Sequence, residues 1–249
     1  MRVLKIQIKA DTLGTVLFEH KAKDNTFRLT LEEAARSGVS LHAAYLAGVD
    51  LTEANLTGIS LGKANMIGAR LKDTVLIGAD LSSANLSSAN LGGADLSRAN
   101  LSGTGLRGAN LAQANLSGAN LSRACLHIAD LNEAILAGAD LSEADLRFAD
   151  LSDADLKGAN FGRADMIRAD LTRADASGAN LAGVNLSYGC LYETCLHHAD
   201  ISHAILTGTL LVDTILDEAI MTGADLSEAN FVTRKTCTSI LNDKSSLDR

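Results

Sequence analysis

The sequence contains no proline and no tryptophan, and aromatic residues make up only 3% of its 249 positions. Four cysteines in so long a chain do not make a disulfide framework. No run of about 18 apolar residues is present to span a bilayer, and the N-terminal MRVLKIQIKADT lacks the unbroken apolar stretch of a signal peptide. We therefore expect a soluble protein of a reducing compartment, the cytoplasm, without a membrane partner.

What is present is a chain that is 47% hydrophobic and carries a formal charge of −8. This apolar content is too high for a disordered acidic chain. A core built of alanine and leucine without aromatic residues must be narrow and uniform. Length alone allows one or two globular domains, but internal repeats have to be considered first.

A five-residue repeat runs from Leu41 to Phe231 without an inserted residue. Its leucine position, which we call i, occurs 39 times, and 32 of these residues are Leu. Position i−2 is Ala in 29 repeats, and position i−1 is Asp or Asn in 25. Gly is frequent at i+2 and supplies turn chemistry there.

Neither regular structure accommodates this period. Five residues rotate an α-helix by about 140°, so successive leucines would scatter around the axis. On a strand, a step of five would place them on opposite faces. A coil that bends once per repeat fits, with i−2 and i inside and i−1, i+1 and i+2 facing solvent. Such coils must stack to bury their leucines.

The segments ADLSS, ANLSG, ADLSE and ANLAQ match the motif A(D/N)LXX, and the chain resembles the pentapeptide-repeat family over residues 39–233. The resemblance implies an all-β fold, a right-handed quadrilateral parallel β-helix with four repeats per coil. The 39 repeats then give about ten coils, a rod about 45 Å long at the usual strand spacing. We expect Leu to fill the axis, Ala to let the walls approach, and Asp or Asn to bond nearby backbone.

Residues 1–38 lack the motif. RVLKIQIKA and TVLFEHKA flank DTLG and predict a β-hairpin. TFRLTLEEAARSG predicts a short helix with Thr30 as N-cap, Glu33 at the third helical position and Gly38 as the stop. We expect this segment to cap the open end of the solenoid; a separate recognition module is the alternative.

The last coils lose their polar i−1 residues, and the tail 234–249 follows them. Outward apolar residues around a terminal coil require a cover. The cover is either the tail or a second subunit, and because DNA-mimic members of the family dimerise through their C-terminal ends, we expect a head-to-head homodimer. The C-terminal apolar residues are Ile205, Leu210, Ile215 and Ile220.

Negative charge is concentrated in the second half of the rod, with −5 over residues 121–180 and −7 over 181–233. Residues twenty apart should share a face, and one face collects carboxylates. It either keeps an Ala/Leu rod soluble or imitates DNA phosphates for a DNA-binding protein. Direct binding of nucleic acid is not expected from this sign of charge. We call this set the acidic face: Asp130, Glu133, Asp150, Asp153, Asp170, Glu193 and Asp213.

A neighbouring face carries an i+2 column that we call the aromatic ladder: Ile128, Phe148, Arg168 and Tyr188. An Arg between two exposed rings marks either a binding hot spot or a stacking ladder that steadies the coils. The segment CLYETCLHHADISH has zinc-binding residue types, but its spacing matches no known metal motif, so we predict no metal and no cofactor. No nucleophile–base pair or phosphate loop is found, and we predict no enzyme.

The resemblance implies a function as a protein-interaction module. Family members related to quinolone-resistance proteins mimic duplex DNA, bind DNA gyrase or topoisomerase IV, and protect or inhibit the enzyme. This chain lacks the inserted loops of the best protectors and has fewer central Phe residues. The alternative is a structural or regulatory scaffold whose N-terminal segment contacts an unrelated protein. An ice-binding solenoid is a more distant option, because the i+1 positions lack a regular Thr array.

Overall fold

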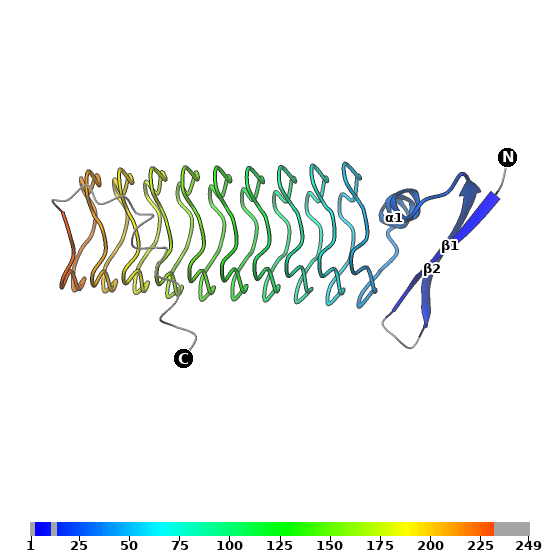
Figure 1. Ribbon diagram of the computed structural model, residues 1–249, viewed down its shortest axis with the longest axis horizontal. Helices are drawn as coiled ribbons and strands as arrows, with labels where there is room; N and C mark the ends of the chain where they lie inside the picture. The colour runs from blue at the N-terminus through cyan, green and yellow to red at the C-terminus, as the bar shows by residue number, and fades with distance from the viewer. Residues whose placement is uncertain (1–2, 11–13, 232–249) are drawn as a thin grey trace.

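We describe residues 3–10 and 14–231 of a computed structural model. Strand β1 (Val3–Lys9) pairs antiparallel with β2 (Val16–Lys23), and helix α1 (Phe27–Arg36) follows. Stacked coils make up the rest of the described chain. In Figure 1 these coils run along the long axis of the molecule, and α1 lies between the hairpin and the first coil.

The coils turn once every twenty residues, which is four repeats. Parallel bridges join each i−1 residue to the i−1 residue twenty positions later, from Ser40↔Ser60 to Leu210↔Asn230. The bonds of each bridge run between coils: Leu126 N donates to Asp145 O at 2.7 Å, and Cys125 N donates to Thr104 O at 2.9 Å. The backbone is thus satisfied by stacking, as expected for a solenoid.

The expected inside–outside pattern is confirmed. Leu126 is 0% exposed and Ala124 1%, and the same holds for nearly every i and i−2 residue until the last coil. Threonine at i−2 is also tolerated inside, because its hydroxyl donates a hydrogen bond to a backbone carbonyl. Thr104 Oγ1, for example, donates to Leu81 O at 2.8 Å. A narrow axis of Leu and Ala is therefore the core of the rod.

Each corner is a turn closed by a hydrogen bond from the next i−2 residue back to i, such as Ala129 N to Leu126 O at 2.9 Å. Every i+2 residue from Ala43 to Glu228 has φ between 54° and 73°. The left-handed conformation is thus adopted whether or not the residue is glycine, although it costs an L-residue about 1 kcal/mol. The glycines at i+2 therefore mark only some of the positions at which the backbone adopts the left-handed conformation.

The polar i−1 residues bond the backbone as expected. Asp50 Oδ1 accepts the Thr52 N–H at 3.1 Å, and Asn115 Oδ1 accepts that of Ser117 at 3.1 Å. The same bond recurs along the rod and holds the chain where it enters each corner.

The helix begins four residues earlier than the sequence indicated. Thr26, not Thr30, is the N-cap, and its Oγ1 accepts the Leu29 N–H at 3.1 Å. Thr30 is buried inside the helix, where its hydroxyl bonds Asn25 Oδ1 at 3.3 Å. Glu33 is accordingly a mid-helix residue that pairs with Arg36 at 3.2 Å, not a residue of the first turn.

The predicted stop at Gly38 is confirmed. Gly38 has φ +63° and donates to Ala35 O at 3.1 Å, while Val39 donates to Ala34 O at 3.0 Å. These two bonds form the Schellman motif that commonly ends helices at glycine.

The two ends of the axis differ. At the N-terminal end, Leu31 and Ala34 of α1 are 0% exposed and join the core cluster with Ile8 and Leu41. At the other end, Leu216 and Met221 are only partly buried.

Candidate protein-binding faces

The acidic face lies on one side of the rod. Asp130, Asp150 and Asp170 follow one another in a single column, because each is bridged to the next. The remaining four members occupy the i+2 position of the same repeats or of repeats twenty or forty residues further on. These bridges agree with the prediction that residues twenty positions apart share a face.

Within this column the carboxylates are half-buried. Asp150 Oδ1 accepts the Ser152 N–H at 2.9 Å, and Asp170 Oδ1 accepts the Thr172 N–H at 2.9 Å and its hydroxyl at 2.5 Å. Burial raises the pKa of Asp170 above its usual value, and the neighbouring Asp150 charge adds to this. Ionised Asp170 is therefore electrostatically unfavourable in the folded state.

One cation lies on the acidic face. Arg173 bonds Asp153 through Nε at 2.7 Å and Nη2 at 2.5 Å. Glu133 accepts a hydrogen bond from Gln113 Nε2 at 2.9 Å, a neutral partner that leaves its charge in place. The acidic face thus combines seven carboxylates with one guanidinium.

On the other faces carboxylates and cations are matched more evenly. Arg147 Nη2 lies 2.7 Å from Asp145 and its Nε 3.6 Å from Asp165. Lys157 Nζ lies 3.2 Å from Asp155 and 3.0 Å from Asp175. Over residues 121–233 the acidic face therefore holds six of the twelve net negative charges, more than any other face.

The aromatic ladder is stacked and yet accessible. The Arg168 guanidinium carbon lies 5.9 Å from the centroid of the Phe148 ring. Ile128 and Tyr188 are 42% and 45% exposed. The ring of Tyr188 lies over Gly208, since a Cβ there would be 2.7 Å from two of its ring carbons. Both sequence interpretations, hot spot and stacking ladder, are compatible with these contacts.

The four C-terminal apolar residues were predicted to need a cover, and they differ in exposure. Ile205, Ile215 and Ile220 are 41%, 46% and 53% exposed, whereas Leu210 is 3% exposed. Leu210 is bridged to the buried Cys190 and is followed by the buried Leu211. Leu210 thus adjoins other buried residues. The tail expected to cover this end lies outside the described residues.

The segment CLYETCLHHADISH, residues 190–203, passes over successive faces of the rod within one coil. The His197 and His198 rings are 3.9 Å apart, and His198 Nδ1 lies 3.0 Å from Glu218. Over residues 3–10 and 14–231, no group of three His, Cys, Asp or Glu side chains is placed to hold a metal ion. In the same part of the chain, α1 is too short to cross a membrane, and no other helix is present.

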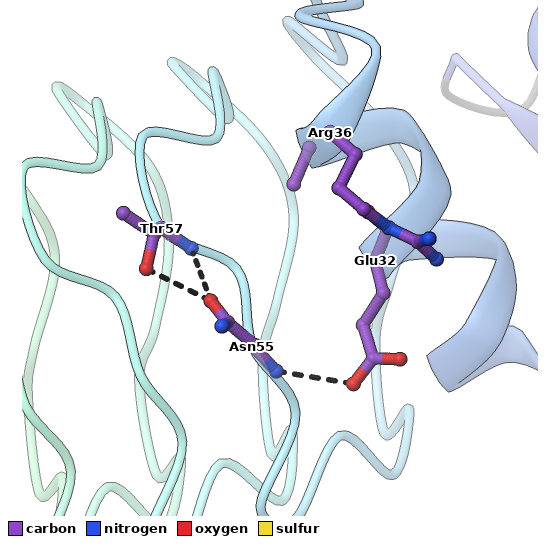
Figure 2. A pocket seen from close by; sticks show the side chains of 5 residues that line it. Glu32, Arg36, Asn55 and Thr57 are labelled. Atoms are coloured by element: carbon purple, nitrogen blue, oxygen red, sulfur yellow. Dashed lines mark hydrogen bonds between the residues drawn. The ribbon is translucent and has the colours of Figure 1, made fainter.

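A groove between α1 and the first coils was not foreseen from the sequence. It has a volume of about 360 Å3 and is lined by Glu32, Ala35, Arg36, Asn55 and Thr57. Figure 2 shows that Glu32 points across the groove to accept the Asn55 N–H, at 3.1 Å, while Asn55 Oδ1 accepts from Thr57. The bond between Glu32 and Asn55 joins the walls of the groove and fastens the helix to the coils, while the bonds between Thr57 and Asn55 lie within the coil wall.

Arg28 adds to this attachment. It bonds Glu32 at 3.2 Å and donates to the carbonyl oxygens of Thr52 at 3.0 Å and Glu53 at 2.7 Å. The only sequence signal was the i, i+4 pairing of Arg28 with Glu32, which does not reveal a contact with the coils.

Comparison with known proteins agrees with the repeat. The family model for pentapeptide repeats matches overlapping segments that together span residues 37–231. HetL, a pentapeptide repeat protein involved in heterocyst differentiation regulation from the cyanobacterium Nostoc sp. strain PCC 7120, is 31% identical, with a TM-score of 0.52 over 81% of this chain and 93% of HetL. QnrB1, a plasmid-mediated fluoroquinolone resistance protein, is 18% identical, with a TM-score of 0.44 over 74% of this chain and 90% of that one.

A search of the curated proteins gave no match. The repeat, the coils and the family match agree over the same residues, and the described coils have the solenoid geometry known for the family. Proteins of this family are generally structural or interaction modules. The chain belongs to the pentapeptide-repeat family.

Proposed function

We propose that this chain is a non-enzymatic, cytoplasmic scaffold that binds a protein partner through the acidic face. The observation that carries the proposal is the imbalance between faces. Seven carboxylates share one guanidinium on the acidic face, whereas Arg147 and Lys157 on the other faces each lie between two carboxylates. Asp170 is held in the column although burial and Asp150 disfavour its charge. Ionised Asp170 lowers the stability of the fold, and basic groups of a partner would offset this cost.

The finer proposal is that the partner is a type II topoisomerase, DNA gyrase or topoisomerase IV, for which the acidic face imitates DNA. Seven carboxylates and one guanidinium leave six net negative charges on this face. Spread over five coils of about 4.8 Å, they amount to one charge per about 4 Å, against one per about 3.4 Å along a DNA strand. The acidic face thus has the charge density of one strand.

The alternative is a regulatory scaffold whose N-terminal segment contacts an unrelated protein. HetL, which is 31% identical and aligns over most of both chains, is described as involved in regulating differentiation. A regulatory role for this chain is therefore the competing proposal. It does not need the acidic face, and this difference allows a test.

The test compares two triple variants of equal charge. Asp130, Asp150 and Asp170 are changed to Asn on the acidic face, and Asp95, Asp155 and Asp175 are changed to Asn on another face as the control. All six are i−1 residues whose Oδ1 accepts a backbone N–H two residues on, and Asn keeps that acceptor. Partner capture from the native host should be lost in the first variant and kept in the second.

Supercoiling by DNA gyrase, measured at several salt concentrations, tests the finer proposal. The wild-type chain and the control variant should change the activity, and the acidic-face variant should not. If the wild-type chain has no effect at micromolar concentration, the topoisomerase proposal is withdrawn. Equal capture of a partner by both triple variants would rule out the acidic face as the binding surface and favour the N-terminal alternative.

We also propose that the chain is a homodimer joined at its C-terminal end, and that residues 1–38 act as a cap. Three exposed isoleucines at that end support the dimer, and the burial of Leu31 against the first coil supports the cap. A cap is what a solenoid needs to keep its open axis from water.

A further inference from the structure

The β1–β2 hairpin has an open edge. The end of β1 is tied to the first coil, since Ala10 bridges Ala44 and the Tyr45 N–H donates to Lys9 O at 2.9 Å. Among the described residues β2 pairs with β1 alone. In Figure 1 the hairpin extends past α1 at the end of the molecule, away from the coils. A two-stranded sheet is marginally stable by itself, and its free edge can accept another strand.

The two sides of the hairpin differ in chemistry. The register places four lysines and one acid on one side: Lys5, Lys9, Lys21, Lys23 and Glu19. We call this the lysine side. Glu19 is 2.5 Å from the Lys5 ammonium group and 3.8 Å from that of Lys21, so one carboxylate serves two cations.

Lys9 and Lys23 are exposed and form no ion pair with any residue of the described chain. The lysine side therefore has three more positive than negative charges, on a chain whose net charge is −8. The opposite side is apolar except for His20, which pairs with Ile6. On this side Ile8 is buried, Phe18 packs against the core, and Leu4 stays 37% exposed.

We propose that the outer edge of β2 binds an extended acidic segment of a partner protein as a third strand. The inference extends the regulatory-scaffold proposal, on which it rests, by naming the kind of partner. Because side chains alternate along a strand, the segment would direct acidic residues to the lysine side and apolar residues to the side of Phe18 and Ala22. Main-chain bonds would supply affinity and the alternating pockets would supply specificity.

Other occupants fit less well. A nucleic acid carries negative charge, but it has no backbone that could pair with β2 and no apolar groups that alternate with the charges. A second copy offers its acidic face, but that face consists of bridged coils with a corner at every fifth residue, not of an extended strand. The chemistry of the hairpin thus selects an extended acidic peptide.

The test uses the full chain and a fluorescein-labelled eight-residue peptide that alternates glutamate and valine, matched in length to the eight residues of β2. Fluorescence anisotropy should show saturable binding. A control peptide with the same composition, four glutamates followed by four valines, should bind about tenfold more weakly, because it cannot separate the two chemistries by side. Hydrogen exchange of β2 amides should slow when the alternating peptide binds.

Charge reversal at Lys21 and Lys23 to Glu should weaken binding of the alternating peptide by about tenfold or more. The same reversal at Lys63 and Lys72, on the coils, is the control and should leave binding within about twofold. If the first variant loses its circular dichroism signal, the double variant Lys21→Gln with Lys23→Gln replaces it. Its loss of peptide affinity should be smaller.

Three results would overturn the inference: equal binding of both peptides, binding unaffected by the lysine changes, or stronger binding of a short DNA duplex. A lysine-dependent dimer in light scattering would instead assign the hairpin to a second copy. The variant with Asp130, Asp150 and Asp170 changed to Asn should bind the peptide like the wild type. Failure of the acidic-face proposal and failure of this one are thereby separable.

Discussion

Arg173 donates two hydrogen bonds to the carboxylate of Asp153, which lies one coil earlier in the same column, at 2.7 Å and 2.5 Å. The guanidinium lowers the pKa of Asp153 below its usual value. It is also the one cation on this face between Asp130 and Asp213. The pair thus joins two coils and at the same time reduces the negative potential of the proposed binding surface.

Changing Arg173 to Gln should strengthen binding of a basic partner and steepen its salt dependence. The expected gain is about two- to fivefold in affinity, since one more unpaired carboxylate attracts a cation in a solvent-screened site. Stability should fall by no more than about 1 kcal/mol, as for other exposed ion pairs. Partner affinity at two salt concentrations, with urea unfolding alongside, measures both effects.

Arg163→Gln is the control for this change, because Arg163 also occupies an i+2 corner with positive φ but lies on another face. It should alter affinity little. Weaker binding by the Arg173 variant alone would mean that the guanidinium itself contacts the partner, and the acidic-face proposal would then be wrong.

Changing Ile215 and Ile220 to Asp should convert a C-terminal dimer into a monomer. Both side chains are about half exposed, 46% and 53%, and neither belongs to the core cluster, so the monomer should lose little packing. Burying two carboxylates in an apolar interface would cost several kcal/mol. Light scattering coupled to gel filtration should show the mass fall by half.

The matched control changes Ile67 and Ile77 to Asp, which are 44% and 37% exposed far from the C-terminal end. This variant should keep the mass of the wild type. A wild-type chain that is monomeric at all concentrations would end the dimer proposal, and the exposed isoleucines would then need another explanation.

Sequence reasoning succeeded where a local rule repeats. The five-residue period predicted which side chains are buried, because each repeat obeys the same geometry as its neighbours. The bond from Asp50 to the Thr52 N–H followed from the known behaviour of Asp before a turn. Gly38 was identified as a helix stop for a similar local reason.

Features that depend on contacts between distant segments could not be predicted from the sequence. The bonds of Arg28 to Thr52 and Glu53 join residues more than twenty positions apart, and no period reveals them. Thr26 rather than Thr30 caps the helix, because the second threonine is drawn into the buried interface with Asn25. Charged corners such as Arg173 adopt positive φ because bonds between coils fix the backbone, whatever the residue.

Changing Gly208 to Ala should destabilise the rod more than changing Gly178 to Ala. Both have nearly equal φ, +66° and +65°, so both lose about 1 kcal/mol when a Cβ enters the left-handed region. A Cβ at Gly178 meets nothing within 4 Å, but at Gly208 it would lie 2.7 Å from the Tyr188 ring. The ring must therefore move away, and urea unfolding should show the additional loss.

Combining Tyr188→Ala with Gly208→Ala tests the cause. In the Tyr188→Ala background the glycine change should cost only as much as it does at Gly178, since the ring is gone. Equal losses for Gly208→Ala and Gly178→Ala in the wild-type background would show that the aromatic ladder is loosely packed and that Tyr188 turns aside freely.

Asp50 and Asp170 should respond to the same substitution, Asp to Asn, with opposite signs. They share a column, and each accepts the N–H and the hydroxyl of a threonine two residues on. The Arg70 hydrogen bond, with further bonds from Thr52, lowers the pKa of Asp50 from 3.8 to about 2. Burial, with the charge of Asp150, raises the pKa of Asp170.

A lowered pKa in the folded state means that the ionised Asp50 stabilises the fold above pH 3.8, and that this contribution is lost as the pH falls through about 2. Asp50→Asn should therefore lower the free energy of unfolding at pH 7, and the difference should shrink toward pH 2. For Asp170 the folded protein binds the proton more tightly than the unfolded chain. Its ionised form is thus a penalty that is absent below pH 3.8 and grows as the pH rises through the folded pKa.

Asp170→Asn should accordingly raise the free energy of unfolding at pH 7, and its advantage should vanish below pH 3.8. Urea unfolding of both variants at several pH values measures the two slopes. A destabilised Asp170→Asn protein at pH 7 would show that the Thr172 bonds outweigh desolvation and the Asp150 charge. Ionised Asp170 would then stabilise the rod, and its electrostatic cost would no longer support a basic partner at the acidic face.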